Sequence, residues 1–106
     1  MMTALNGMES VVRTMSDSIL QTERECYLTG STSDLHRHHI FGGSLRAASE
    51  KWGCWVYLRA DWHNCSNYGV HFNPELSLML KQECQKRFED LYGHEKLMEI
   101  FIKNYL

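Results

Sequence analysis

Apolar residues recur with helical spacing at both ends of this chain, whereas its middle holds two short apolar runs. In residues 4–20 an apolar side chain stands every third or fourth position, which places these side chains on one face of a helix. They are Leu5, Met8, Val12, Met15 and Ile19. We therefore predict an N-terminal amphipathic helix within residues 1–23, which either docks on the rest of the chain or pairs with a second copy.

The C-terminal third predicts two helices. Asn73, Pro74 and Glu75 form a helix start, because a capping side chain precedes a proline at the first helical position and an acid in the first turn. Gly93 is placed to end this helix, and a second helix is expected over residues 95–105. The apolar face of the first helix consists of Leu76, Leu80, Cys84, Phe88 and Leu91, and that of the second of Leu97, Phe101 and Tyr105.

The middle of the chain has the pattern of two short strands. LHRHHI (residues 35–40) fits a strand that leaves into a glycine loop. CWVYLR (residues 54–59) is rich in aromatic and β-branched residues, as strands are. Between them, RAASEKW (residues 46–52) predicts one or two helical turns, and the polar residues 60–73 predict a helical turn followed by a loop. The chain therefore predicts a small α+β domain over residues 24–106.

Composition limits the class of protein. The chain has 106 residues, of which 43% are hydrophobic, and a single proline, so one domain with a small core is expected. No apolar run approaches the ~18 residues that a membrane helix needs, and the start lacks the pattern of a secretion signal. We therefore expect a cytoplasmic protein without membrane contact. In that compartment the four cysteines, none of which form C-x-x-C, should be reduced thiols.

The charge pattern limits how the chain could bind DNA. The net charge of −2 argues against a broadly basic nucleic-acid surface. Residues 35–65, however, carry more basic than acidic residues, and both flanking segments are acidic. Any DNA contact should come from this central segment and reach phosphates rather than bases. The candidates are Arg37, Arg46, Lys51 and Arg59.

Histidines supply the candidate chemistry, since five of the six lie between positions 36 and 71. On a strand, His36 and His38 face one side, and Arg37 and His39 face the other. One imidazole can then bind a metal ion while its neighbour acts as a base near neutral pH. Neutral imidazoles suit zinc, nickel, cobalt and manganese. Taken singly, His36 and His94 are expected to be ordinary surface or core residues.

Several short motifs in order, HRHHIFGG, WVYLR, HN, GVHFNPEL and FIKNYL, resemble the small HNH-type (ββα-metal, or His-Me finger) endonucleases of phages and prophages. The resemblance covers residues 24–106. It implies a ββα-metal core followed by two helices, and a metal-dependent DNA endonuclease or nickase that acts on double-stranded DNA inside a bacterial host cell. One divalent ion (Mg, Mn, Ni or Zn) is implied.

The resemblance also implies a role for each matching residue. His38, His63 and His71 correspond to metal ligands. His39 corresponds to the general base that activates water. Asn64 corresponds to a residue that orients His63 or a phosphate. A divalent ion would then neutralise charge while water attacks the phosphorus.

Two features of this chain depart from the family pattern. Many relatives bind a structural zinc through two C-x-x-C pairs, but the matching positions here are Cys26, Thr29, Arg59 and Trp62. With three of the four thiolates absent, no structural zinc is expected, and Trp62 should fill the space. The family's central asparagine, which steadies the loop before the second strand, is also absent from SEKWGCWV. Its role is either empty or taken by another group.

Two other functions remain open. The first is a binding protein on the same fold, such as a phage inhibitor of a host defence nuclease or a packaging accessory; the acidic flanks and the N-terminal helix favour such a protein partner. The second is a metal-buffering protein. The four histidines at positions 38, 39, 63 and 71 favour catalysis, because a pure binder has no need of them. A homodimer through the N-terminal helix would place two centres on one duplex.

Overall fold

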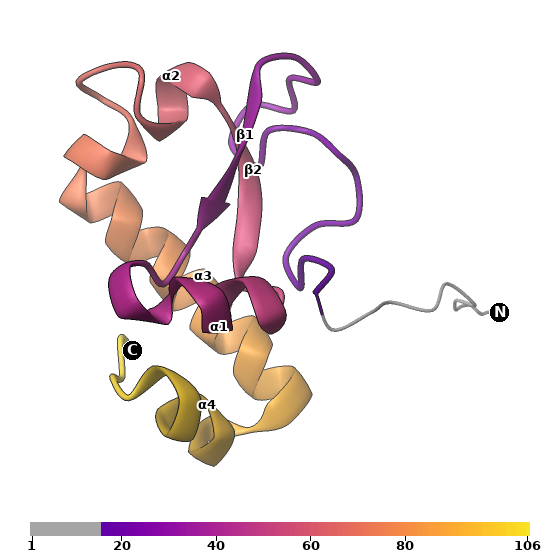
Figure 1. The fold of residues 1–106 in the computed structure, drawn as a ribbon, viewed down its shortest axis with the longest axis vertical. Helices are drawn as coiled ribbons and strands as arrows, with labels where there is room; N and C mark the ends of the chain where they lie inside the picture. Colours follow the sequence, from indigo (N-terminus) through magenta and orange to yellow (C-terminus); the bar gives the residue numbers. More distant parts are fainter. Residues whose placement is uncertain (1–15) are drawn as a thin grey trace, which may run out of the picture.

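Two short antiparallel strands form the sheet around which the chain is arranged (Figure 1). The computed structural model describes residues 16–106. Strand β1 spans Leu35–His39 and strand β2 spans Trp55–Arg59, with His38 opposite Val56 in the register. Both strands were predicted from the sequence, and both are confirmed.

Short helices lie at the two ends of the strands, and two longer helices follow (Figure 1). Helix α1 connects β1 to β2, and α2 continues directly from the end of β2. The α+β class is therefore confirmed, as are the helical turns predicted after each strand. The bounds are Gly43–Leu45 for the 3-10 turn η1, Arg46–Lys51 for α1, Ala60–His63 for α2, Val70–Phe72 for the 3-10 turn η2, Pro74–Tyr92 for α3 and His94–Phe101 for α4.

Strand alternation separates two environments. Val56 and Leu58 are fully buried and point to the same sheet face as His36 and His38. On this inner face the strands join one hydrophobic core with α3, to which the helix contributes Leu80, Cys84 and Phe88. The outer face carries Arg37, His39, Trp55 and Tyr57. Neighbouring histidines of β1 therefore lie in different surroundings, as the sequence predicted.

Helix α3 begins and ends where its caps predict. The Asn73 side chain accepts a hydrogen bond from the Leu76 amide at 3.1 Å, and Gly93 ends the helix with a φ of 90°. The prediction that Leu91 belongs to the buried face of this helix is wrong, because Leu91 is 37% exposed. The packing passes instead from Phe88 to Tyr92, whose ring meets that of Trp52 edge-on at 5.1 Å.

Helix α4 is shorter than predicted, because it ends at Phe101 and Ile102 has a left-handed φ of 72°. The following residues bond to α3 instead of continuing the helix. The Tyr105 amide donates to Gln85 Oε1 at 2.8 Å, and Gln82 Nε2 donates to the Tyr105 carbonyl at 2.9 Å. Gln85 is fully buried. Its side-chain amide thus replaces the helical hydrogen bonds that the sequence pattern suggested.

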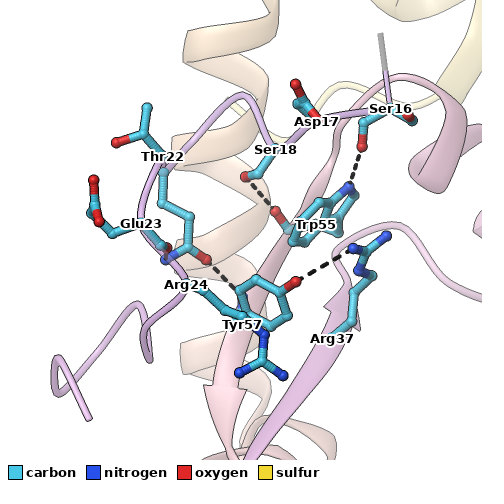
Figure 2. Close-up of a pocket in the computed structure, with 10 residues that line it drawn as sticks. Ser16, Asp17, Ser18, Thr22, Glu23, Arg24, Arg37, Trp55 and Tyr57 are labelled. Carbon is cyan, nitrogen blue, oxygen red and sulfur yellow. Dashed lines mark hydrogen bonds between the residues drawn. The ribbon is translucent and has the colours of Figure 1, made fainter. Parts of the chain in front are cut away.

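The predicted N-terminal helix does not extend into the described residues. Residues 16–23 contain turns and bends, and they lie along the outer face of the sheet (Figure 2). Trp55 Nε1 donates to the Ser16 carbonyl at 2.8 Å, and the Ile19 amide donates to the Gly53 carbonyl at 2.9 Å. These tertiary bonds outweigh helical periodicity here. The rest of that prediction, including the proposed dimer contact, falls on residues 1–15, outside the described residues.

The four cysteines are free thiols, as expected, and three of them are buried: Cys26, Cys54 and Cys84. Cys84 lies in the core of α3, which confirms its predicted packing role. Across residues 16–106, none of the helices combines the length and the apolar character needed to cross a membrane.

Ser49 braces the connection between the strands. It is fully buried on α1; its Oγ accepts a hydrogen bond from the Phe41 amide at 3.1 Å and donates to the Cys54 carbonyl. One hydroxyl therefore joins the chain that leaves β1 to the chain that enters β2. Ser49 and Cys54 both lie in the SEKWGCWV segment.

Ser49→Ala should lower the free energy of unfolding by about 2 kcal/mol, because it leaves the buried Phe41 amide without its partner. It also removes one of the two hydrogen bonds that the Cys54 carbonyl accepts, the other coming from the Ile40 amide at 3.0 Å. The exposed Ser44→Ala serves as the control and should change it by less than about 0.5 kcal/mol. Urea unfolding followed by tryptophan fluorescence measures both. Equal stability of the two variants would contradict the bracing role.

Candidate metal centre

Three histidines from three separate elements converge on one point. His38 lies near the end of β1, His63 is the last residue of α2, and His71 lies in η2. Ligand nitrogens of all three lie within 4.8 Å of one another. His63 Nε2 and His71 Nε2 are 3.0 Å apart. The structure therefore brings together all three residues that the sequence resemblance named as ligands.

The loop between α2 and η2 places His71 beside His63. Gly69 allows the close approach, because a Cβ there would lie 2.7 Å from the His63 carbonyl oxygen and 2.9 Å from that of Asp61. The loop is also tied to Asp61 by its side chains, since the Tyr68 hydroxyl donates to Asp61 Oδ2 at 2.7 Å. A glycine at this position is thus part of what builds the site.

His36 supports His63 from behind. His36 Nδ1 and His63 Nδ1 are 3.0 Å apart. If Nε2 of His63 faces the centre, its Nδ1–H can donate to His36, the kind of contact that fixes the ring of a metal-binding histidine. The sequence predicted an ordinary surface or core role for His36, and the structure adds its contact with His63. The signal was its position two residues before His38, on the same face of β1.

The surroundings favour uncharged imidazoles. Burial, with smaller contributions from His63 and His71, lowers the pKa of His38 to about 3. Burial and the neighbouring His71 lower the pKa of His63 to about 4. Both rings are therefore neutral at pH 7, with lone pairs that are free to bind a cation.

The donor set suits one divalent ion. An ion with metal–nitrogen bonds of about 2.1 Å holds neighbouring ligand nitrogens roughly 3 Å apart, which matches the 3.0 Å between His63 and His71. Three neutral imidazoles are typical ligands of zinc, nickel and manganese, and they leave coordination positions for water or a phosphate oxygen.

His39 has a different partner, on the outer face of the sheet. His39 Nε2 lies 2.7 Å from Glu50 Oε1, and Glu50 Oε2 lies 2.7 Å from Arg37 Nη1. Burial raises the pKa of Glu50, but the bonds from His39 and Arg37 outweigh it, so the pKa lies below its ordinary value. An ionised carboxylate can only accept, so His39 Nε2 carries a proton, and in the neutral ring Nδ1 is then the nitrogen with the lone pair.

Glu50 was not singled out by sequence reasoning. A signal existed, because Glu50 is the one acid between positions 35 and 60, in a segment otherwise basic. The partner of His39 could be found only from the tertiary structure, since α1 folds back against the end of β1 and brings the carboxylate to the imidazole.

Open cavities meet at His39. A cavity of about 490 Å³ is lined by His38, His39 and His71 on one side and by Lys81 of α3 on the other. A smaller one, about 200 Å³, adds His63 and Arg46 to the histidines. A substrate group could therefore reach both the free nitrogen of His39 and the three-histidine cluster from solvent.

The four predicted DNA-contacting residues have different surroundings. Arg46 is exposed and lines the cavities beside His39. Lys51 is exposed at the end of α1. Arg59 forms an ion pair with Asp61 at 2.7 Å, which offsets its charge. Arg46 is thus the member of this set best placed to meet a phosphate at the histidines.

Arg37 is engaged on the outer face, where its guanidinium carbon lies 3.7 Å from the Trp55 ring centroid and Nη2 donates to the Tyr57 hydroxyl (Figure 2). It borders a cavity of about 580 Å³ that is also lined by Asp17 and Glu23. Sequence reasoning did not anticipate this cavity, and its lining mixes both charges.

Asn64 stands apart from the role suggested for it. Its side chain is exposed and its Oδ1 accepts from the Cys65 thiol at 3.3 Å. None of the hydrogen bonds in the described part of the chain links the Asn64 side chain to His63, whose Nδ1 meets His36 instead.

The lowered pKa of His38 predicts acid-sensitive stability. In the unfolded chain the His38 imidazole binds a proton below pH 6.5, whereas in the folded chain it does so only near pH 3. The contribution of the neutral His38 to the free energy of unfolding is therefore complete above pH 6.5 and is lost as the pH falls towards 3. When the pH falls from 7 to 5 in the presence of a chelator, the free energy of unfolding should decrease in both the wild type and His38→Gln. The decrease should be smaller in His38→Gln, by on the order of 1–2 kcal/mol. Urea unfolding at both pH values measures it, with the exposed His94→Gln as control. Parallel losses in all three proteins would contradict a neutral, buried His38.

Comparison of the chain with models of known protein families, with curated proteins and with solved structures finds no match. The geometry of the histidine site is therefore the basis for assigning a function.

Proposed function

We propose that this protein is a metal-dependent phosphodiester hydrolase, a DNA endonuclease or nickase of the HNH type. One observation carries the proposal: His39, whose Nε2 meets Glu50, lines the same cavity as two of the three clustered imidazoles, His38 and His71. A base beside a cation site is the arrangement that hydrolysis of a phosphodiester needs.

The three imidazoles of His38, His63 and His71 would hold one divalent ion. Such an ion, when bound, supplies positive charge that stabilises the phosphate and the departing 3′ oxygen. His36 keeps the His63 ring in place through the Nδ1 contact at 3.0 Å. Three ligands from three elements fix the site more firmly than a flexible histidine tract would, which argues against simple metal buffering.

His39 would act as the general base. Its Nδ1 takes a proton from a water molecule, whose oxygen attacks the phosphorus in line with the 3′ oxygen that leaves. The products carry a 5′-phosphate and a 3′-hydroxyl, the latter protonated from solvent. Glu50 holds Nε2 as the donor throughout and stabilises the imidazolium that forms, much as a buried carboxylate does for a catalytic histidine elsewhere.

The order of elements also agrees with a ββα-metal core. The donors come from the first strand and from the segment after the second strand. The positions that relatives use for a structural zinc lie side by side as well, since Cys26 is hydrogen-bonded to the Thr29 side chain and to the Arg59 backbone. Trp62, at the fourth of these positions, is half-buried, with its ring against that of Tyr68. These features support descent from the phage and prophage nucleases of bacterial cells.

Purified protein should nick supercoiled plasmid at low salt when manganese, magnesium, nickel or zinc is added, and a chelator should stop it. His39→Ala should reduce the rate by about 10²–10⁴-fold, because general-base catalysis contributes that much. Glu50→Gln should reduce it less, because the base remains but its orientation and charge partner are weakened.

His94→Ala is the matched control, since His94 is exposed and pairs with Glu89 away from the cluster. It should cut at the wild-type rate. A wild-type protein that binds metal yet is as inert as His39→Ala would refute the nuclease and favour the alternative, a binding protein that keeps the HNH fold for a protein partner.

A further inference from the structure

A groove leads away from the histidines towards residues 103–105. The cavity of about 490 Å³ that begins at His38 and His39 ends at Lys81. A second cavity, about 380 Å³, begins at Lys81 and ends at Lys103 and Tyr105. The two share Pro74, Ser77 and Lys81 of α3 as lining residues. Together they form one path along the first turns of α3.

Two lysine ammonium groups lie along this groove, that of Lys81 where the two cavities meet and that of Lys103 in the second cavity. Lys81 Nζ is 5.3 Å and Lys103 Nζ is 5.1 Å from the centroid of the Tyr105 ring. The negative face of an aromatic ring attracts such cations and limits where they move. Two positive charges that would otherwise repel are thus gathered around one tyrosine.

Among residues 16–106, no carboxylate lines either cavity of the groove, although the chain carries 13 acidic residues against 11 basic ones. The large cavity on the outer face of the sheet differs, because Asp17 and Glu23 accompany its arginines. The groove is therefore selectively positive on a protein of net negative charge. Such a surface attracts an anion locally rather than over the whole molecule.

The tyrosine that organises the lysines is firmly held. Its amide and carbonyl bond to Gln85 and Gln82, and its ring packs 5.6 Å from that of Phe41. Gln85 is fully buried and also donates to Asn104 Oδ1 at 2.6 Å. A buried amide that fixes two consecutive residues of the FIKNYL motif makes this end of the groove a preformed site.

Exposed apolar side chains lie along the same path. Phe72, at 62% exposure, lines the first cavity, and Leu78, at 45%, lines the second. Cations next to exposed aromatic and apolar groups are the features with which proteins bind a nucleic-acid strand, through its phosphates and through its sugars and bases.

We propose that this groove binds the strand that carries the cleaved bond, with Lys81 and Lys103 contacting successive phosphates on one side of it. Arg46, beside His39, lies where the strand continues on the other side. The inference rests on the proposed nuclease function and gives the FIKNYL motif its role, a phosphate-binding subsite that extends the catalytic cavity. The contacts are to phosphates, so the subsite should not distinguish between sequences.

The test measures DNA binding without cleavage. A fluorescein-labelled duplex is titrated in chelator at salt concentrations from about 50 to 200 mM, and the slope of log affinity against log salt reports the number of phosphate contacts. Lys81→Gln and Lys103→Gln should each reduce the magnitude of that slope by about one. Lys103→Arg should retain it. Lys96→Gln, which removes a charge from α4 that pairs with Glu99, is the matched control and should leave it unchanged.

Three results would each contradict DNA binding in the groove. They are an unchanged slope for Lys103→Gln, a reduction for Lys96→Gln equal to that for the groove lysines, and no DNA binding by the wild type at about 50 mM salt. The outcome is separate from that of the nicking assay. If the wild type nicks DNA but the lysine variants have an unchanged slope, the enzyme binds DNA elsewhere. If the lysine variants have a reduced slope but the wild type does not nick, the groove binds DNA and the nuclease function is refuted.

Discussion

The close approach of three imidazoles, two of which have pKa values lowered by burial, is the interaction on which the rest of the site depends. Burial keeps His38 and His63 neutral, with pKa values of about 3 and 4. Their nitrogens can then lie near that of His71 without charge repulsion. The fold sustains this arrangement from three elements, and Gly69 permits the loop that closes it. A cation completes such a cluster more readily than a proton does.

The two-residue period of β1 explains how one short segment serves two purposes. His38 faces inward to the cluster, while His39, the next residue, reaches Glu50 on the other side. Both rings nevertheless meet at one cavity, because the strand ends at His39. The proposed metal ligand and the proposed base therefore come from adjacent positions, and Ser49 keeps the following loop in place.

Local features were predictable from the sequence because they depend on neighbours along the chain. The cap at Asn73, the stop at Gly93 and the aromatic composition of β2 each act within a few residues. The clustering of the three ligands followed from the resemblance. The contacts of His36 and Glu50 did not, since each joins residues brought together only by folding. The same holds for Gln85, whose buried amide ends the predicted helix early, and for residues 16–23, which bond to the sheet.

We propose that one ion binds to these three imidazoles, and X-ray absorption spectroscopy of the protein loaded with one equivalent of zinc can show its ligands. Three imidazole nitrogens are expected at about 2.0–2.1 Å, with oxygen in the remaining position or positions, and one imidazole fewer in His71→Ala. Sulfur scattering from a cysteine, or a spectrum that is the same in His71→Ala as in the wild type, would contradict it.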